Sequence, residues 1–498
     1  MSARSFIVRA AAAFLVVALC ASGAFATNGM NLEGYGPMSV GMGGTSFAFW
    51  NGTAAVMNNP ATLGLLTNGM HLDLALGSLG PDVKAIVTTP GGAVSATSLS
   101  DAFYMPALGF VMKKNAFAFG LAVFSQGGMG TEYGSDSWMA DPSQGANTAL
   151  DEGLVNRSEV GVGRVIVPVT YDVNEKLTLG LTGDFVWAGM DLQMAMSEPQ
   201  FQNLANPAAQ TIGMASGTLV TAFGSLYEPF GGTGISKLYH AYFDFSNTSA
   251  FTGEARGYGI AGKIGGLYKM NERLSLGATY HTKTSLGDLK TENATLSMGV
   301  NVDPGVFVGS PSGTYQDMNI PVAGSISVKD FEWPAMLGFG AAYKPVERLL
   351  LALDFKYVYW SSVMKDFRMV FTADKSAENG AFAGLVLDAT LFQKWENQAV
   401  IALGGAVEAT DKLTVRAGYN YGKNPIPDKY LNALFPAIVE NHATFGAGYK
   451  ITEAVSGDAS LAYAFTKNAT NPGNGSTIPP VESEHGQLNW MVMLGYQF

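Results

Sequence analysis

Hydrophobic and polar residues alternate with a period of two along much of the chain. In the stretch 349–360, every second residue is apolar or aromatic, whereas the other face carries Asp354 and Lys356. The same alternation recurs in residues 177–188, 413–421 and 488–498. A period of two with one apolar face is typical of a β-strand, because successive side chains point to opposite faces.

Short polar breaks between such stretches predict six tight hairpin turns, at 113–115, 173–176, 271–272, 345–347, 409–411 and 452–453. Long Gly/Pro/Ser/Asn-rich connections alternate with these turns, and the largest are 192–256 and 293–323. Short turns at one end and long loops at the other are typical of outer-membrane barrels. The pattern predicts an all-β, 14-stranded antiparallel transmembrane β-barrel, with strands near 70–80, 102–112, 116–126, 157–172, 177–191, 257–270, 274–289, 324–344, 349–360, 397–408, 413–422, 441–450, 455–465 and 486–498.

Tyrosines support the barrel over a soluble β-sandwich. Five of them precede a short turn or the chain end, and all five share the outward phase: Tyr171, Tyr268, Tyr343, Tyr449 and Tyr496. Tyrosine collects where lipid meets water, so we expect these five to form an aromatic girdle at the periplasmic side. A sandwich would instead keep a charged outer face, whereas the polar faces here are rich in Gly, Ser and Thr.

Composition and the N-terminus indicate an exported protein. Charged residues make up only 14% of the 498 residues, whereas 47% are hydrophobic. Arg4 and Arg9 precede an apolar run, and Ala24-Phe25-Ala26 fits a cleavage site, so residues 1–26 are predicted to be a signal peptide. We expect residues 27–68 to form an N-terminal unit and residues 69–498 to form the barrel.

Several kinds of chemistry find no support in the residues. The single cysteine, Cys20, lies in the predicted signal, which argues against disulfides and thiol catalysis in the mature chain. Removing the two signal arginines takes the net charge from −11 to −13, which does not suit nucleic-acid binding. The five histidines lack metal-ligand spacing, and no phosphate or dinucleotide motif is present. We therefore expect no enzyme, no cofactor and no metal site.

The segment before the first predicted strand does not alternate. Residues 27–68 contain seven glycines between Gly29 and Gly52, and then Asn59-Pro60-Ala61. Their apolar residues, such as Phe47 and Trp50, would be poorly placed in water. A barrel of fourteen strands leaves an open channel unless something fills it, so a plug inside the lumen is the preferred interpretation.

At this point the sequence resembles the FadL/TodX outer-membrane transporters of long-chain fatty acids and aromatic hydrocarbons. The residues from Asn28-Gly29 to Asn59-Pro60-Ala61 resemble the family's hatch, although Asn51-Gly52-Thr53 stands where family hatches often carry an acidic residue. The stretches 334–343, 351–361, 395–404 and 416–427 resemble its middle and later strands. The resemblance covers essentially the whole mature chain.

The resemblance implies passive outer-membrane transport of hydrophobic molecules, most simply long-chain fatty acids. Uptake of aromatic hydrocarbons or alkanes is the alternative. The cargo would land on an extracellular groove, occupy a lumen pocket above the hatch and leave sideways at a kink in the third strand. The implied partners are membrane lipid, lipopolysaccharide, a hydrophobic small molecule and the barrel assembly machinery acting on the C-terminal Phe498. The chain is expected to be a monomer in the outer membrane of a Gram-negative-type cell.

The landing groove is predicted in the loop 192–256, on a set of apolar side chains that could instead pack as the loop's own core. They are Phe201, Leu204, Leu219, Phe223, Leu226, Phe230, Phe243 and Phe245. Exposed apolar patches normally mark binding.

Six charged residues are predicted from their phase to face the lumen: Arg164, Asp184, Lys263, Asp354, Lys356 and Arg416. Arg164 or Lys263 could hold a substrate carboxylate. The alternative, which is favoured for any one residue, is a salt-bridge network that ties the hatch to the wall.

Three other functions are weighed against transport of this kind. A general porin needs a wide charged lumen, and it would show large steady ionic currents. An outer-membrane lipase is conceivable because His281 falls on an inner face, but no Gly-x-Ser-x-Gly motif is present. A structural or adhesive barrel would bind no hydrophobic ligand.

Overall fold

The computed structural model describes residues 28–143, 150, 153–249 and 252–498. The predicted signal peptide, residues 1–26, lies outside the described residues. In the part that is described, no helix is long and apolar enough to cross a membrane.

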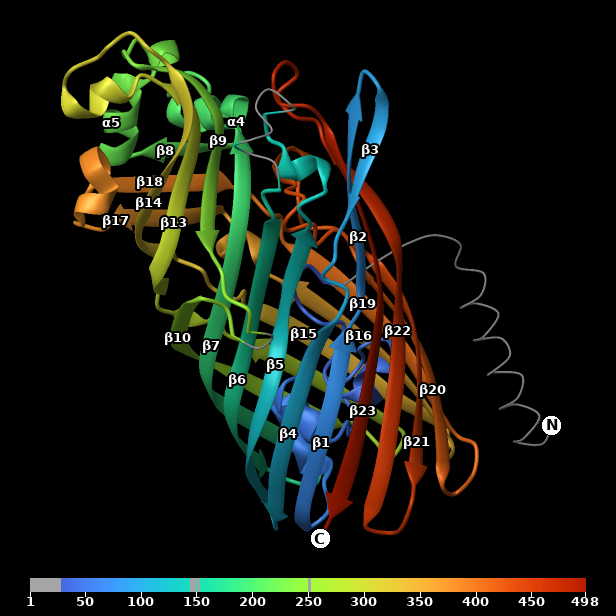
Figure 1. The fold of residues 1–498 in the computed structure, drawn as a ribbon. Coiled ribbons are helices and arrows are strands. Elements are labelled where there is room, and N and C mark those ends of the chain that lie inside the picture. Colours follow the sequence, from blue (N-terminus) through green and yellow to red (C-terminus); the bar gives the residue numbers. More distant parts are fainter. Residues whose placement is uncertain (1–27, 144–149, 151–152, 250–251) are drawn as a thin grey trace.

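The described chain is dominated by antiparallel strands that join into one continuous sheet (Figure 1). The strands of the first half are β1 (Gly69–Leu79), β2 (Pro81–Thr89), β3 (Gly92–Thr97), β4 (Phe103–Lys114), β5 (Phe117–Tyr133), β6 (Asn156–Asp172), β7 (Leu177–Ser197), β8 (Gly213–Ser216), β9 (Ile235–Phe245), β10 (Ala255–Lys269), β11 (Leu274–His281) and β12 (Ser285–Leu286).

The second half continues in the same way, with β13 (Leu289–Val302), β14 (Gln316–Lys329), β15 (Met336–Val346), β16 (Leu349–Val358), β17 (Asp366–Ala373), β18 (Val386–Phe392), β19 (Gln398–Glu408), β20 (Leu413–Gly422), β21 (Asn441–Lys450), β22 (Val455–Asn471) and β23 (Val481–Gln497). The helices are short: α2 (Pro37–Val40), α4 (Glu198–Ala205), α5 (Thr218–Leu226), η1 (Thr53–Val56), η2 (Pro60–Leu65), η3 (Trp138–Ala140), η4 (Glu228–Phe230), η5 (Pro304–Val308), η6 (Trp360–Ser362), η7 (Ala377–Phe382) and η8 (Asp428–Tyr430).

The sheet closes on itself as a 16-stranded barrel. The closed circuit runs through β1, β4, β5, β6, β7, β9, β13, β10, β11, β15, β16, β19, β20, β21, β22 and β23. The predicted count of fourteen strands is wrong, because the sequence interpretation treated 192–256 and 293–323 as loops. β9 and β13 lie in those segments, and they enter the circuit between β7 and β10. From the Met190–Ala255 pair toward the end of the barrel with the short turns, β7 and β10 pair directly with each other.

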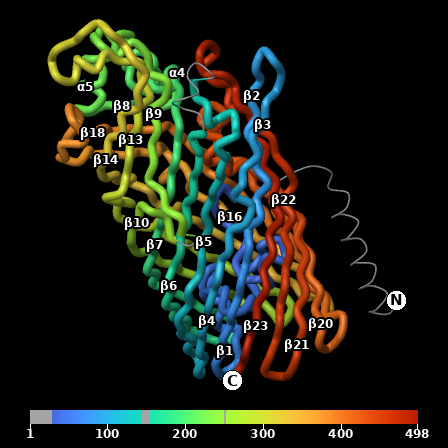
Figure 2. The backbone as a smooth tube through the Cα atoms, viewed as in Figure 1, coloured from blue at the N-terminus to red at the C-terminus, as the bar shows by residue number. Residues whose placement is uncertain are grey.

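The six predicted hairpin turns are confirmed. Each joins two strands that pair as neighbours, at the barrel end where the C-terminus lies (Figure 1). The long connections gather at the opposite end, where β2 and β3 form a hairpin that rises above the wall (Figure 2). The predicted strand 324–344 is also wrong, because it contains parts of both β14 and β15.

The outward face of the barrel is apolar. Leu181 is 54% exposed and Leu353 is 49% exposed, and the five girdle tyrosines are between 42% and 50% exposed. Exposing so many large apolar side chains to water would cost free energy, so this surface suits contact with lipid tails.

The N-terminal segment, residues 28–68, lies inside the barrel and is called the hatch from here on. Phe47, Val56, Met57 and Leu63 are at most 1% exposed. Gly277 of the wall touches this segment so closely that a Cβ atom there would come within 1.8 Å of the Phe47 carbonyl oxygen. The hatch and the wall are therefore packed against each other without space for an intervening side chain at this point.

We predict that Leu181→Arg destabilises the folded barrel by about 2–4 kcal/mol, because a charge on the lipid face must leave water. Urea unfolding of the chain refolded in lipid vesicles measures this change. Val308→Arg is the matched control, since Val308 is 80% exposed in η5, and it should shift stability by less than about 0.5 kcal/mol. Equal effects of the two substitutions would argue against a lipid-facing Leu181.

Candidate functional site

Two inward charges of β16 bind the hatch backbone. Asp354 Oδ2 accepts hydrogen bonds from the amides of Ser46 at 2.7 Å and Phe47 at 3.1 Å. Lys356 Nζ donates to the carbonyl oxygens of Glu33 at 2.6 Å and Gly44 at 3.0 Å. Both charged side chains are buried, so these bonds offset their desolvation.

A second wall carboxylate that binds the hatch, Asp73 of β1, was missed by the sequence interpretation. Its Oδ2 accepts the amide of Thr53 at 2.7 Å, and its Oδ1 lies 3.0 Å from His71 Nε2. Asp73 lies next to Asn51-Gly52-Thr53, the hatch stretch that has no acidic residue of its own. The alternation of Leu72, Asp73 and Leu74 was the available signal, because it places Asp73 on the inner face.

The motif Asn59-Pro60-Ala61 fastens the hatch to three strands. Asn59 Nδ2 donates to the carbonyl oxygens of Phe47 at 2.7 Å and Gly266 of β10 at 3.1 Å. Asn59 Oδ1 caps η2 by accepting the Ala61 amide at 3.1 Å. Thr170 of β6 donates its hydroxyl to the Pro60 carbonyl at 2.9 Å, and Gly180 of β7 packs against the same turn.

The remaining predicted lumen charges form ion pairs with other side chains of the wall. Arg164 Nη1 lies 2.7 Å from Asp184 Oδ2, and Lys263 Nζ binds the same oxygen. Arg416 Nη1 lies 2.7 Å from Asp458 Oδ1. All six predicted side chains therefore point inward, and each has a protein partner.

The third strand in the wall, β5, carries a β-bulge where it meets the hatch. Its pairing with β6 skips one residue between Ser125 and Gly127, which leaves Gln126 as the extra residue. The hatch forms hydrogen bonds with β5 at this point. Tyr35 donates its hydroxyl to the Gln126 carbonyl at 2.6 Å, and Asn31 forms a backbone bridge with Gly127. The Gln126 side chain accepts from Arg164 Nε.

The bulge lies beside a gap between β4 and β5, here called the window. β4 and β5 pair only up to Leu108 and Val123, although both strands continue. Above this point β4 remains paired with β1, and β5 remains paired with β6. The window is closed at its top by the hydrogen bond from the Leu99 amide to the Glu132 carbonyl at 2.7 Å.

A cavity of about 350 Å³, here called the lumen cavity, opens at this window. Its inner lining includes Met30 and Leu32 of the hatch. On β6 it is lined both by Val160 and Val162, which face inward, and by Gly161, which faces outward. The lining therefore includes residues from both faces of the wall, beside the window between β4 and β5.

A second cavity of about 230 Å³, here called the loop cavity, lies among the long connections. It is lined by apolar side chains such as Met139, Met194 and Leu434, and by the cation Lys429. Lys429 Nζ lies 5.4 Å from the centre of the Tyr430 ring.

The eight residues predicted for the landing groove lie elsewhere. Five are at most 3% exposed, and Phe201 packs against the rings of Phe223 and Phe230. The linings of the lumen cavity and the loop cavity include none of the eight. The ring of Tyr227 belongs to the same cluster, and burial, followed by its hydrogen bond to Glu198, raises the pKa of this tyrosine. The geometry favours the packing alternative, in which these residues are the core of the loop.

We predict that Asp354→Ala loosens the hatch by about 3 kcal/mol, because two amides lose a charged acceptor. The measurement is the rate of chymotrypsin cleavage within residues 28–68 of the folded chain in detergent. Asp411→Ala is the control, since Asp411 pairs with Arg348 on the surface and its side chain is 87% exposed. Cleavage rates that do not differ between the two variants would contradict the anchoring role of Asp354.

Within the described residues, no group of three or more His, Cys, Asp or Glu side chains could hold a metal ion. The arrangement offers instead an apolar path with two cavities, a stoppered lumen and a lateral window. Such a path can bind and pass a hydrophobic molecule, since apolar burial is its main source of free energy.

Known proteins share the fold of this chain. The structure resembles the toluene transporter TodX of P. putida, with a TM-score of 0.74, 29% sequence identity and coverage of 94% of this chain and 99% of that one. Outer membrane protein P1 of Haemophilus influenzae is 25% identical over 438 residues, which are 84% of this chain and 81% of that protein. An uncharacterized Chlorobium limicola protein is 52% identical over 71 residues, so the chain spans only 35% of that relative's length.

The sequence model of one family, described as outer membrane protein transport protein (OMPP1/FadL/TodX), matches residues 13–488. This match includes the hatch, the bulged β5 and nearly all of the barrel. The family comprises transporters and channels of the outer membrane, and not enzymes. The chain is therefore a member of the OMPP1/FadL/TodX family of outer-membrane transporters of hydrophobic compounds.

Proposed function

We propose that this protein lets uncharged hydrophobic molecules cross the outer membrane passively, through the loop cavity, the lumen cavity and the window between β4 and β5. The observation that carries the proposal is the lining of the lumen cavity by both faces of β6. A molecule held above the hatch has a lateral way out at the adjacent window between β4 and β5, whereas the hatch blocks the way straight down.

Apolar burial supplies the driving force for each step. Each CH₂ group that leaves water gains about 0.8 kcal/mol, in a cavity as well as in lipid. Transfer from the lumen cavity to the bilayer therefore exchanges one apolar environment for another. No energy source is needed, because net movement follows the concentration gradient.

The charges of the lumen support an uncharged cargo. Lys263, Lys356, Arg164 and Arg416 are all engaged by carboxylates, by hatch carbonyls or by Gln126. Among the described residues that line the lumen cavity, Arg256 is the single cation, and its Nε donates to the Gly253 carbonyl at 3.0 Å. A carboxylate at the inner lining of the lumen cavity, away from the exposed Arg256, would thus lose its hydration without gaining a charged partner. The related TodX is named as a toluene transporter.

Long-chain fatty acids are the second candidate, and Lys429 favours them. This cation lines the loop cavity, where a carboxylate could stay at the polar end while its chain lies among the methionines. Three further points stay predictions. They are that the barrel assembly machinery acts on Phe498, that the barrel contacts lipopolysaccharide and that the chain is a monomer.

Gly161→Trp tests the lateral exit. A Cβ atom at Gly161 meets nothing within 4 Å, so the indole fits on the outward side of the lumen cavity and obstructs the window. Toluene uptake by cells that express the full chain should fall by about tenfold or more, since even one misplaced methylene costs about that much in an apolar site.

Gly183→Trp is the matched control. Gly183 of β7 is also outward-facing, and a Cβ atom added there would also meet nothing within 4 Å, but this residue does not line the lumen cavity. The substitution should leave uptake unchanged at equal amounts of folded protein. Equal uptake by the two variants would contradict the lateral exit.

The choice of cargo is tested by comparing toluene and palmitate uptake in wild-type and Lys429→Ala cells. If the cargo is uncharged, we expect Lys429→Ala to leave toluene uptake unchanged. Palmitate uptake that exceeds toluene uptake and falls on loss of Lys429 would establish the fatty-acid alternative instead.

A further inference from the structure

A short segment that belongs to no strand separates the two cavities. Residues 431–437, here called the strap, follow η8 and precede β21. Leu431 and Leu434 line the loop cavity, whereas Pro436 and Ala437 line the lumen cavity. The strap therefore has one cavity on each side.

The strap is held by side chains rather than by strand pairing. The Leu434 carbonyl accepts the hydroxyl of Thr131 at 3.1 Å and also that of Ser158. The Ala433 carbonyl accepts the hydroxyl of Tyr133 at 3.0 Å, and the Pro436 carbonyl accepts His485 Nδ1–H at 2.8 Å. These donors come from β5, β6 and β23, so the strap is held by strands on both sides of the β1–β4 pair, near the window.

Leu434 lies in the partition where the linings of the two cavities meet. Thr131 lines the lumen cavity, and the same residue's hydroxyl binds the backbone of Leu434, which lines the loop cavity. Leu434 is 3% exposed, and its side chain packs in the apolar cluster beside the loop cavity.

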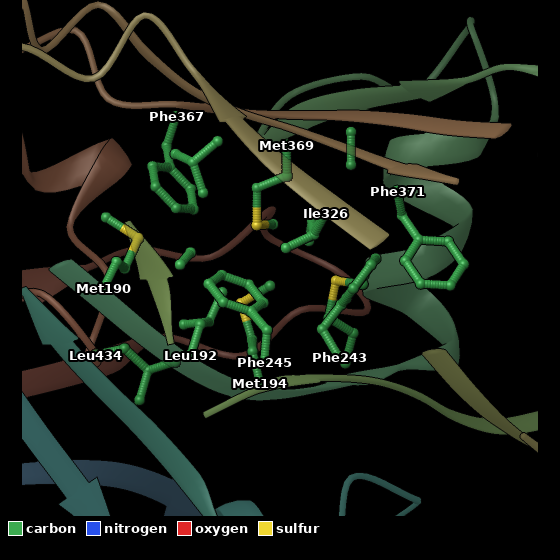
Figure 3. Packing of buried hydrophobic residues seen from close by; sticks show 14 of the residues in the cluster. Met190, Leu192, Met194, Phe243, Phe245, Ile326, Phe367, Met369, Phe371 and Leu434 are labelled. Atoms are coloured by element: carbon green, nitrogen blue, oxygen red, sulfur yellow. The ribbon is translucent and has the colours of Figure 1, made fainter. Parts of the chain in front are cut away.

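The facing side of the partition is the inner face of β7. Ala188 lines the lumen cavity and Met194 lines the loop cavity, whereas Met190 and Leu192 lie between them and are buried. Figure 3 shows Met190, Leu192 and Leu434 in the same apolar cluster. Methionine side chains can change shape at little cost, whereas the strap side is pinned through its carbonyls.

We infer that Leu434 is the residue that determines the size of the molecules passing from the loop cavity to the lumen cavity. The inference rests on the proposed function. Cargo that follows this route must displace the Leu434 side chain or the methionines opposite it, and only the methionines are adaptable. The bulk of residue 434 thus sets the limit.

The test measures uptake of two uncharged probes, toluene and the larger pyrene, by cells that express the full chain. Leu434→Ala should raise pyrene uptake relative to toluene by about tenfold, the discrimination that small volume changes confer in apolar sites. Leu434→Trp should lower the uptake of both probes. Uptake is normalised to the folded, heat-modifiable band in the outer membrane.

Leu431→Ala is the matched control, because Leu431 is also 3% exposed and lines the loop cavity, but its carbonyl binds Asn471 and not Thr131. It should leave the pyrene-to-toluene ratio unchanged. A Leu434→Ala ratio equal to that of wild type or of Leu431→Ala would overturn the inference.

Thr131→Val gives a second measurement that does not depend on a cavity-forming substitution. It keeps the side-chain shape and removes one hydrogen bond to the strap, so it should also raise the ratio. If the two single variants Thr131→Val and Leu434→Ala both leave the pyrene-to-toluene ratio unchanged, the strap does not determine the size of the molecules that pass. Failure of wild-type cells to take up either probe faster than cells without the protein would overturn the proposed function itself.

Discussion

Inside a bilayer every backbone N–H and C=O group needs a partner within the protein, and this constraint governs the whole molecule. Closure of the sheet satisfies it around the wall. The exception lies above the Leu108–Val123 pair, where β4 and β5 separate. There the hatch supplies partners, since Tyr35 binds the Gln126 carbonyl and Asn31 bridges to Gly127. A lateral window is thus compatible with lipid because a segment inside the barrel replaces the missing strand contacts.

The same hatch accounts for the charges of the lumen. Buried charges are costly unless they are bonded, and Asp354, Lys356 and Asp73 find their partners in the hatch backbone. Their hydrogen bonds connect the hatch to the wall. In the proposed function, recognition therefore rests mainly on the shape and the apolar lining of the two cavities.

The alternation of side chains predicted what depends on local geometry. The period of two predicted the outward tyrosines and the inward phase of Arg164, Asp184 and Lys263, and the polar breaks between strands predicted the turn positions. The structure shows the same orientations and the same turns. The strand count was wrong because β9 and β13 lie among Gly- and Ser-rich stretches that look like loop in the sequence. Whether Phe223 packs inward or faces a groove depends on distant partners, and no spacing encodes that. The strap was also missed, because its contacts use backbone carbonyls that any sequence possesses.

The hatch closes the barrel, and in the proposed function the cargo must therefore leave sideways. Single-channel conductance of the purified wild-type chain in planar bilayers tests this closure most directly. We expect no large steady ionic current, because the space between the lumen cavity and the periplasmic end is filled by residues 28–68. A stable open current of porin size through the intact chain would contradict the claim.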